Sequence, residues 1–219
     1  MLARRPPRSV LAALLAVALL LVLGACGGDD GADGADGADG TDDTSASASP
    51  SRALPTGDVE VPDDVELTPA GADLDFGDTA TVAYQVGDAG SVVELTVVAA
   101  QTARIRDLAA YQLDRATRRS TPYYVRVRVA NVGTGQLGRR AVPLFAVDGR
   151  DTLVQPSTFT TPFERCPSRP LPRRFGPGAE TTTCLVYLLP DRGSLEALSY
   201  RPLQSFEPIT WSGEVRPPR

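Results

Sequence analysis

The chain has 219 residues and a formal net charge of −5, and all 22 of its basic residues are arginine. Because the sequence contains neither histidine nor lysine, it excludes a Ser-His-Asp triad, a P-loop lysine, a lysine Schiff base and the histidine-containing zinc sites. We therefore predict a protein that is not an enzyme, with no cofactor and no metal site, and the lack of a basic stripe with interleaved aromatics predicts no nucleic-acid partner.

Residues 1–25 are predicted to be the signal peptide of a bacterial lipoprotein. A basic start precedes an apolar run over residues 10–23. At 14 residues, this run is shorter than the roughly 20 that a membrane-spanning helix needs. Arg4-Arg5 is compatible with twin-arginine export, but Pro6-Pro7 follow where that signal usually has other residues. The general export route is therefore favoured, with twin-arginine export as the alternative.

The signal ends in Leu23-Gly24-Ala25-Cys26, which is typical of the bacterial box where diacylglycerol is attached to a cysteine before cleavage. We expect Cys26 to carry this lipid together with palmitate, because two or more acyl chains give stable membrane anchoring. The alternative is an ordinary signal-peptidase site with an incidental cysteine. Under the favoured interpretation, the rest of the chain is held at the extracytoplasmic face of the cell membrane.

Residues 26–71 are predicted to be the lipidated cysteine and a disordered tether. Residues 27–71 hold 12 acidic residues and one arginine, and a Gly-Ala-Asp unit repeats from residue 31. Few apolar groups among many like charges do not offset the entropy lost on ordering. Calcium binding by the repeated aspartates is the alternative, but the ligand spacing of an EF-hand is missing.

From residue 72 to residue 215 the sequence predicts an all-β domain. Short runs with period-two alternation, separated by Gly, Pro and Asp, are typical of strands, and their number and spacing predict an immunoglobulin-like antiparallel β-sandwich. A mixed pattern at 108–118 predicts a short helix or an irregular crossover. The predicted strands span residues 79–86, 91–105, 123–129, 142–147, 183–189, 195–200 and 208–212.

Alternation within these runs predicts the core-facing side chains. In the strand at 123–129, Tyr124, Arg126 and Arg128 are expected on a solvated outer face, opposite Tyr123 and its valines. The strand at 183–189 is apolar on both faces and is therefore expected at the centre of its sheet. Residues 88–90 are expected to form a hairpin loop. In the strand at 91–105, the predicted inner residues are Val93, Leu95, Val97, Ala99, Ala103 and Ile105.

With Cys26 lipidated, the two remaining cysteines, Cys166 and Cys184, are expected to form a disulfide in an oxidising compartment. The bond would close a Pro-rich loop and add about 3 kcal/mol to stability. The loop carries Arg169, Arg173 and Arg174, so it is a candidate partner-binding surface. The simpler alternative, which we favour, is a long loop stapled for stability.

The domain has a resemblance to a known family, which four segments carry: residues 124–133, 145–149, 176–178 and 184–187. The domain resembles a family of bacterial, largely actinobacterial, cell-surface lipoproteins with a domain of unknown function, which is itself similar to a secreted mycobacterial immunoprotective antigen. This resemblance implies an immunoglobulin-like sandwich at the cell surface and supplies no catalytic residues. Because Trp211 follows both domain cysteines, the likeness to immunoglobulins is one of architecture only.

The favoured hypothesis is a lipid-anchored, non-catalytic binding or interaction module of the cell envelope. The partner, whether an envelope or an extracellular molecule, would contact the arginines of the loop and the strand face, which suit an anion. One alternative is a solute-binding lipoprotein of a transporter, which would need two α/β lobes and a deep cleft. A second is a carboxylate-dependent hydrolase. Its candidate acids, which turn chemistry also explains, are Asp73, Asp75, Asp78, Asp148 and Asp151.

Overall fold

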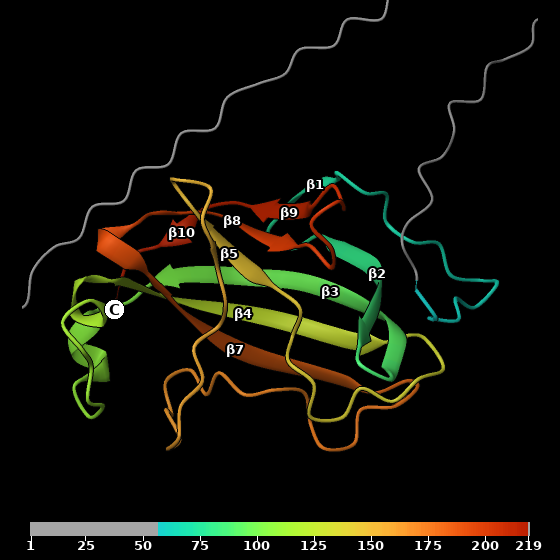
Figure 1. The fold of residues 1–219 in the computed structure, drawn as a ribbon, viewed down its shortest axis with the longest axis horizontal. Helices are drawn as coiled ribbons and strands as arrows, with labels where there is room; N and C mark the ends of the chain where they lie inside the picture. Colours follow the sequence, from blue (N-terminus) through green and yellow to red (C-terminus); the bar gives the residue numbers. More distant parts are fainter. Residues whose placement is uncertain (1–56, 219) are drawn as a thin grey trace, which may run out of the picture. The chain divides into compact units, whose positions relative to one another are not determined.

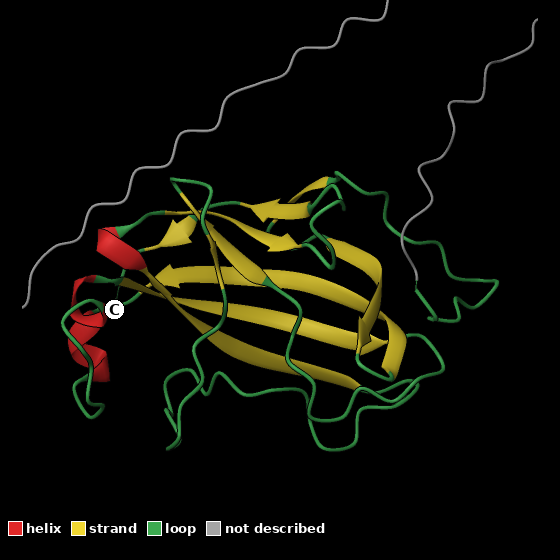
Figure 2. Ribbon diagram, in the orientation of Figure 1, coloured by secondary structure: helices red, strands yellow, loops and turns green. Residues whose placement is uncertain are grey.

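The computed structural model describes residues 57–218, and these form two β-sheets packed face to face (Figure 1). The predicted signal peptide, Cys26 and the first part of the predicted tether lie outside the described residues. The described part contains only three short 3₁₀ segments besides strands, Ile105–Leu108, Thr117–Arg119 and Pro190–Arg192 (Figure 2). The predicted all-β sandwich is therefore confirmed, and the region at 108–118 is irregular as expected.

The first sheet has the strand order β1-β9-β8-β5-β6. The second has the order β10-β3-β4-β7, and β2 also pairs with β3. All pairs are antiparallel except β1 with β9 and β10 with β3, which are parallel and depart from the predicted all-antiparallel arrangement. The strands are β1 (Asp73–Asp75), β2 (Thr79–Val86), β3 (Ala89–Thr102), β4 (Thr121–Asn131), β5 (Phe145–Asp148), β6 (Leu153–Val154), β7 (Glu180–Leu189), β8 (Leu195–Tyr200), β9 (Ile209–Ser212) and β10 (Val215–Arg216).

The main core lies between the two sheets. Alternation along β4 buries Val125, Val127 and Val129 completely, while Arg126 and Arg128 stay exposed. Trp211 on β9 is also fully buried, and its indole N–H donates a 3.2 Å hydrogen bond to the Asp78 carbonyl. The inward-facing residues predicted for β4 are therefore confirmed.

A β-bulge in β3 changes the predicted inner face of that strand. The register with β4 shifts between Val97 and Ala99, so that Val97 pairs with Val127 and Ala100 pairs with Val125. Val98 is pushed into solvent, and Ala100 takes the buried position. The prediction that Ala99 shares the inner face with Val97 is wrong, because the extra residue of a bulge reverses the alternation that follows it.

The hairpin between β2 and β3 turns one residue earlier than predicted. Val86 pairs with Ala89, which leaves Gly87 and Asp88 as the two loop residues. Gly87 has a φ of 57°, which glycine adopts without the steric cost of a side chain. The short loop fixes the register of the hairpin.

Strand β7 is at an edge of its sheet, and the prediction that it is central is wrong. Different groups of residues pack against its two apolar faces. The inner face joins the main core, whereas Val186 on the outer face joins a second apolar cluster with Leu108, Phe163 and Cys166. Burial on both faces therefore comes from loops packed on the outside of the sheet.

Residues 57–71, which belong to the predicted tether, contact the sandwich. The Thr68 and Thr81 backbones are joined by a 2.9 Å hydrogen bond, and the Thr68 hydroxyl accepts a second 2.9 Å bond from the Thr81 N–H. The Gly71 N–H donates to the Glu207 carbonyl at 3.1 Å, and Val59 is buried. This segment lies along β2, and so residues before 72 also take part in the packing of the sandwich.

Asn131, the last residue of β4, organises the loops at one end of the sandwich. Its side-chain amide donates to the carbonyls of Gly135 and Phe175 at 2.9 and 3.1 Å. Its side-chain oxygen accepts hydrogen bonds from the Ser91 hydroxyl at 2.6 Å and from the Gly133 N–H at 3.2 Å. Asn131 is only 1% exposed, so these bonds replace water completely.

The glycines after Asn131 allow a close approach of backbones. A Cβ atom at Gly133 would overlap the backbone of Val92, and one at Gly135 would overlap the Gly90 carbonyl. Residues 131–133, which contribute to the family resemblance, thus have a structural role. The Asn131 amide binds the loop, and Gly133 lets the loop backbone come close to β3.

Within residues 57–218, no helix is long and apolar enough to cross a membrane.

Candidate binding cleft

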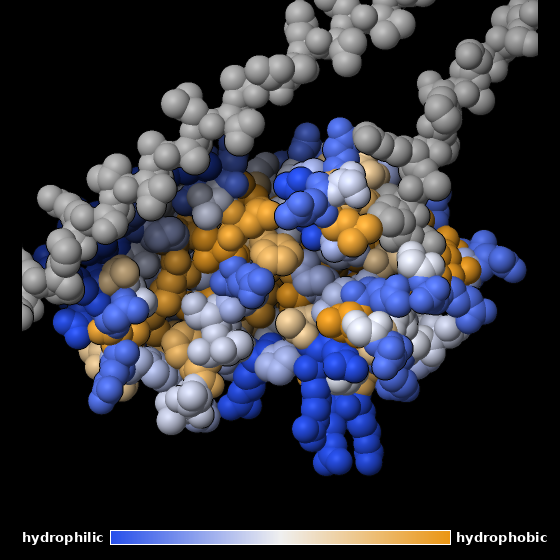
Figure 3. Space-filling view, viewed as in Figure 1, coloured by the Kyte–Doolittle hydropathy of each residue, from blue (hydrophilic) through white to orange (hydrophobic). Residues whose placement is uncertain are grey.

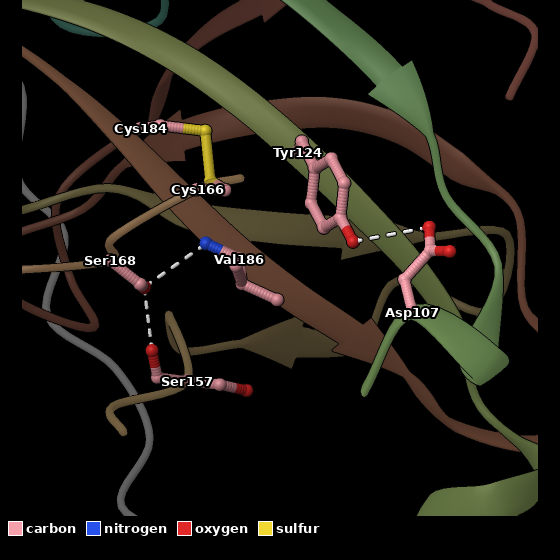
Figure 4. The surroundings of a disulfide bond; sticks show 7 residues. All are labelled: Asp107, Tyr124, Ser157, Cys166, Ser168, Cys184 and Val186. Atoms are coloured by element: carbon pink, nitrogen blue, oxygen red, sulfur yellow. Dashed lines mark hydrogen bonds between the residues drawn. A yellow bond between two sulfur atoms is a disulfide. The ribbon is translucent and has the colours of Figure 1, made fainter. Parts of the chain in front are cut away.

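The predicted disulfide is present and fixes a loop on the edge of β7. Cys166 and Cys184 are bonded, with their Cα atoms 5.0 Å apart (Figure 4). Nearby, the Ser168 hydroxyl donates to the Ser157 carbonyl at 2.5 Å and accepts from the Val186 N–H at 3.0 Å. Ser168 is buried, so it connects the two loop segments and the strand edge.

The outer face of β4 is partly covered rather than fully solvated, which corrects the prediction for Tyr124. This side chain is half-buried and packs on Phe163, with ring centroids 5.7 Å apart. Its hydroxyl donates a 3.4 Å bond to the Asp107 carboxylate (Figure 4). Burial, followed by the charge of Asp107, raises the pKa of Tyr124 to about 12. Tyr124 is thus a structural contact for the outer apolar cluster.

Two of the five arginines singled out in the sequence line the same groove. Arg126 from β4 and Arg169 from the disulfide loop border a hollow of about 460 Å³, together with Thr181–Thr183 of β7. Arg128 lies further along β4, where its Nε is 3.8 Å from the Glu180 carboxylate and both side chains are largely exposed. Such an exposed ion pair contributes little to stability.

Arg173 and Arg174 are exposed. Neither of them is among the residues that line the groove or the other hollows described below. Of the loop arginines, Arg169 therefore has the position expected of a binding residue, and Arg173 and Arg174 are suitable comparison positions.

Arg169 also lines a second hollow, which we call the cleft. It has a volume of about 440 Å³ and lies where the end of β2, the loop before β5, the segment after β6 and the end of β8 meet. Hydrophobic residues gather over β5 and β7 on this face, bordered by hydrophilic side chains (Figure 3). The volume is within the range of small-molecule sites.

Three arginines line the cleft, namely Arg139, Arg169 and Arg201. Of the described residues that line it, none is Asp or Glu, and no ion pair within residues 57–218 involves any of the three guanidinium groups. The Nη2 of Arg201 donates to the Gln204 carbonyl at 2.7 Å, whereas its Nε is buried without a hydrogen-bond partner. The cleft is therefore a positively charged site.

Sequence reasoning missed Arg139 and Arg201. They come from loops that are distant in the chain, and only the packing of β5 and β8 in one sheet brings them to the same cleft as Arg169. One local signal exists: Arg201 directly follows the predicted strand at 195–200. A residue at a strand end lies where loops gather, but the sequence does not show which loops those are.

The aspartates considered for a hydrolase have structural roles in turns. Asp148 accepts hydrogen bonds from the backbone N–H groups of Arg150 and Thr152 at 2.9 and 2.8 Å. The Thr152 hydrogen bond is the largest cause that lowers the pKa of Asp148. The Asp78 carboxylate accepts from the Asp75 N–H at 3.0 Å, and no cluster of three or more possible metal ligands occurs among residues 57–218.

Comparison with known proteins gives one match among solved structures. The sequence matches none of the family models and none of the curated proteins with which it was compared. The structure is similar to that of MPT63, a secreted protein from Mycobacterium tuberculosis, with a TM-score of 0.45 and 9% sequence identity over 64% of this chain and 96% of that chain.

Proposed function

We propose that this protein is a lipid-anchored, extracytoplasmic binding module without catalytic activity, and that its ligand or partner is anionic. One observation supports the binding role above the others: three arginines line one cleft, where no described residue supplies a compensating carboxylate. Guanidinium groups without acidic neighbours favour carboxylate or phosphate groups, to which they can donate two parallel hydrogen bonds. The anchoring role is supported by the sequence from Leu23 to Cys26.

The alternative of a transporter's solute-binding protein has less support. Residues 57–218 form a single sandwich rather than the two α/β lobes that this class was expected to have. The hydrolase alternative also lacks support, because the carboxylates of Asp148 and Asp78 already serve turns. Of the three hypotheses, only the non-catalytic binding module gives the cleft arginines a role.

Replacing Cys26 with Ala is expected to move the protein from the membrane fraction to the soluble exported fraction and to abolish incorporation of a labelled fatty acid. The physical reason is that acyl chains supply the membrane affinity, at about 0.8 kcal/mol for each buried CH₂ group. Fractionation and lipid labelling of the expressing cells measure both effects. A variant that still carries the label and still sediments with the membrane would contradict the anchor.

Changing Arg126 and Arg169 together to Gln is expected to reduce crosslinking of the anchored protein to envelope partners. Both side chains line the groove, so their loss removes two positive charges from one surface. The matched control is the Arg173→Gln, Arg174→Gln pair, which removes the same charge from exposed positions outside the groove. Equal crosslinking by all three proteins, measured by quantitative mass spectrometry, would exclude the groove as the contact surface.

A further inference from the structure

The cleft has an apolar wall built mainly from aromatic and aliphatic side chains. Tyr84 and Tyr200 line it, but their hydroxyls already donate to the carbonyls of Ala141 and Ala83. Burial raises the pKa of both tyrosines, so they remain neutral. Their hydroxyl groups are therefore already occupied, and the small part of these residues that borders the cleft is apolar.

Exposed hydrophobic side chains gather around the cleft. Among residues 57–218, the large hydrophobic residues that remain exposed are Val86, Val98, Leu153 and Leu203. Val86 lines the cleft itself. Leu153 and Leu203 line an adjoining hollow of about 440 Å³, which shares Phe145, Arg201 and Pro202 with the cleft. Three of these four residues therefore border one continuous apolar path, a concentration typical of a ligand site.

Arg201 lies where this apolar path crosses from one hollow to the other, since it lines both. Its Nη2 is held by the Gln204 carbonyl, and its buried Nε has no partner. No ion pair among residues 57–218 compensates the charge of the Arg201 guanidinium, and an oxyanion in the cleft would supply the missing negative charge. Arg139 and Arg169 supply two further guanidinium groups around the same hollow.

We infer that the cleft binds an amphipathic anion: a single acyl chain with an oxyanion head group, either carboxylate or phosphate. The acyl chain of the ligand lies along the path from Val86 toward Leu203, and its head group accepts hydrogen bonds from Arg201 and the neighbouring arginines. This inference rests on the proposed function as a binding module and specifies the class of its ligand. It adds a site separate from the Arg126 groove, with Arg169 on the boundary between the two.

The test is a titration of a soluble form of the protein, residues 27–219, which lacks the proposed signal peptide and lipidated Cys26, with four probes below their micelle-forming concentrations. Dodecanoate and dodecyl phosphate carry the two head groups, dodecyl maltoside carries the same chain without charge, and inorganic phosphate carries charge without a chain. Calorimetry and backbone NMR shifts are expected to show binding of both anionic amphiphiles at the cleft, at least about ten-fold tighter than either control. The head group that binds tighter identifies the natural one.

Variants separate charge from apolar contact. Arg201→Gln is expected to weaken binding of the anionic amphiphiles about ten-fold, and Arg201→Lys is expected to restore only part of it because the planar guanidinium with its parallel donors is lost. Leu203→Ser is expected to weaken binding, whereas Val98→Ser, at an exposed hydrophobic residue outside both hollows, is expected to leave it unchanged. Circular dichroism and thermal unfolding confirm that each variant is folded.

Three results would overturn the inference. Equal affinity for dodecyl maltoside would show that the cleft does not recognise an anionic head group. Equal effects of the Leu203 and Val98 variants would show that the acyl chain does not lie along the apolar path. A concentration-dependent dimer that shifts the cleft resonances without any amphiphile would assign the cleft to a second copy of the chain. The crosslinking test of the proposed function is a separate measurement, and Arg126, which lines the groove but not the cleft, distinguishes the two surfaces.

Discussion

Replacing Asn131 with Ala is expected to lower the free energy of unfolding by about 3 kcal/mol, because several buried polar groups would lose their partner at once. The amide of Asn131 donates to the Gly135 and Phe175 carbonyls, and its oxygen accepts from Ser91 and Gly133. Water cannot replace these bonds readily at a site where Asn131 is 1% exposed. Urea unfolding, followed by the fluorescence of the single tryptophan, measures the change.

Two variants serve as controls for Asn131. Ser91→Ala removes one of the four partners and is expected to cost about 1 kcal/mol. Thr134→Ala changes an exposed residue of the same loop, and its effect is expected to stay within about 0.5 kcal/mol. If Asn131→Ala destabilised the protein no more than Thr134→Ala, the hydrogen-bond network would not be the element that holds these loops.

Replacing Cys166 and Cys184 together with Ala is expected to lower the free energy of unfolding by about 3 kcal/mol. The bond joins residues 18 apart, so its loss releases a loop of moderate length in the unfolded chain. Cys166 is also fully buried in the outer apolar cluster, which adds a packing loss. Denaturant unfolding of the variant and of the wild type measures the sum.

The disulfide also has a local effect that can be measured. Without it, the Val186 amide, which donates to the Ser168 hydroxyl, is expected to exchange its hydrogen faster, while amides at the centre of β4 keep their relative protection. The reduced wild-type protein should behave like the double variant. Uniform acceleration of exchange across both sheets would contradict a local role for the bond.

The sequence predicted the strands with strong alternation and missed the short ones. The runs at 79–86 and 195–200 have the same bounds as β2 and β8. Strands β1, β6 and β10 have only two or three residues, which is too few to establish a period of two. These short strands form because neighbouring strands offer unpaired edges. Which edges are unpaired depends on the tertiary structure and cannot be read from the local sequence.

The position of β7 shows a second limit of sequence reasoning. Apolar residues on both faces of a strand indicate burial, but they do not indicate what covers each face. Here the outer cover is the cluster around Leu108 and Phe163, from loops without a periodic pattern. The cleft was missed for a related reason, since Arg139, Arg169 and Arg201 belong to three separate loops.

The covering of β7 also has a consequence for the behaviour of many copies on one surface. An edge strand of ten residues would be a template for pairing with the same strand of a neighbouring molecule. The Ser157 and Ser168 N–H groups occupy the outward carbonyls of Val186 and Cys184, and the Ser168 hydroxyl occupies the Val186 amide. At Cys184 and Val186 these backbone groups are therefore not free to pair with a strand of a neighbouring molecule, which disfavours edge-to-edge association there.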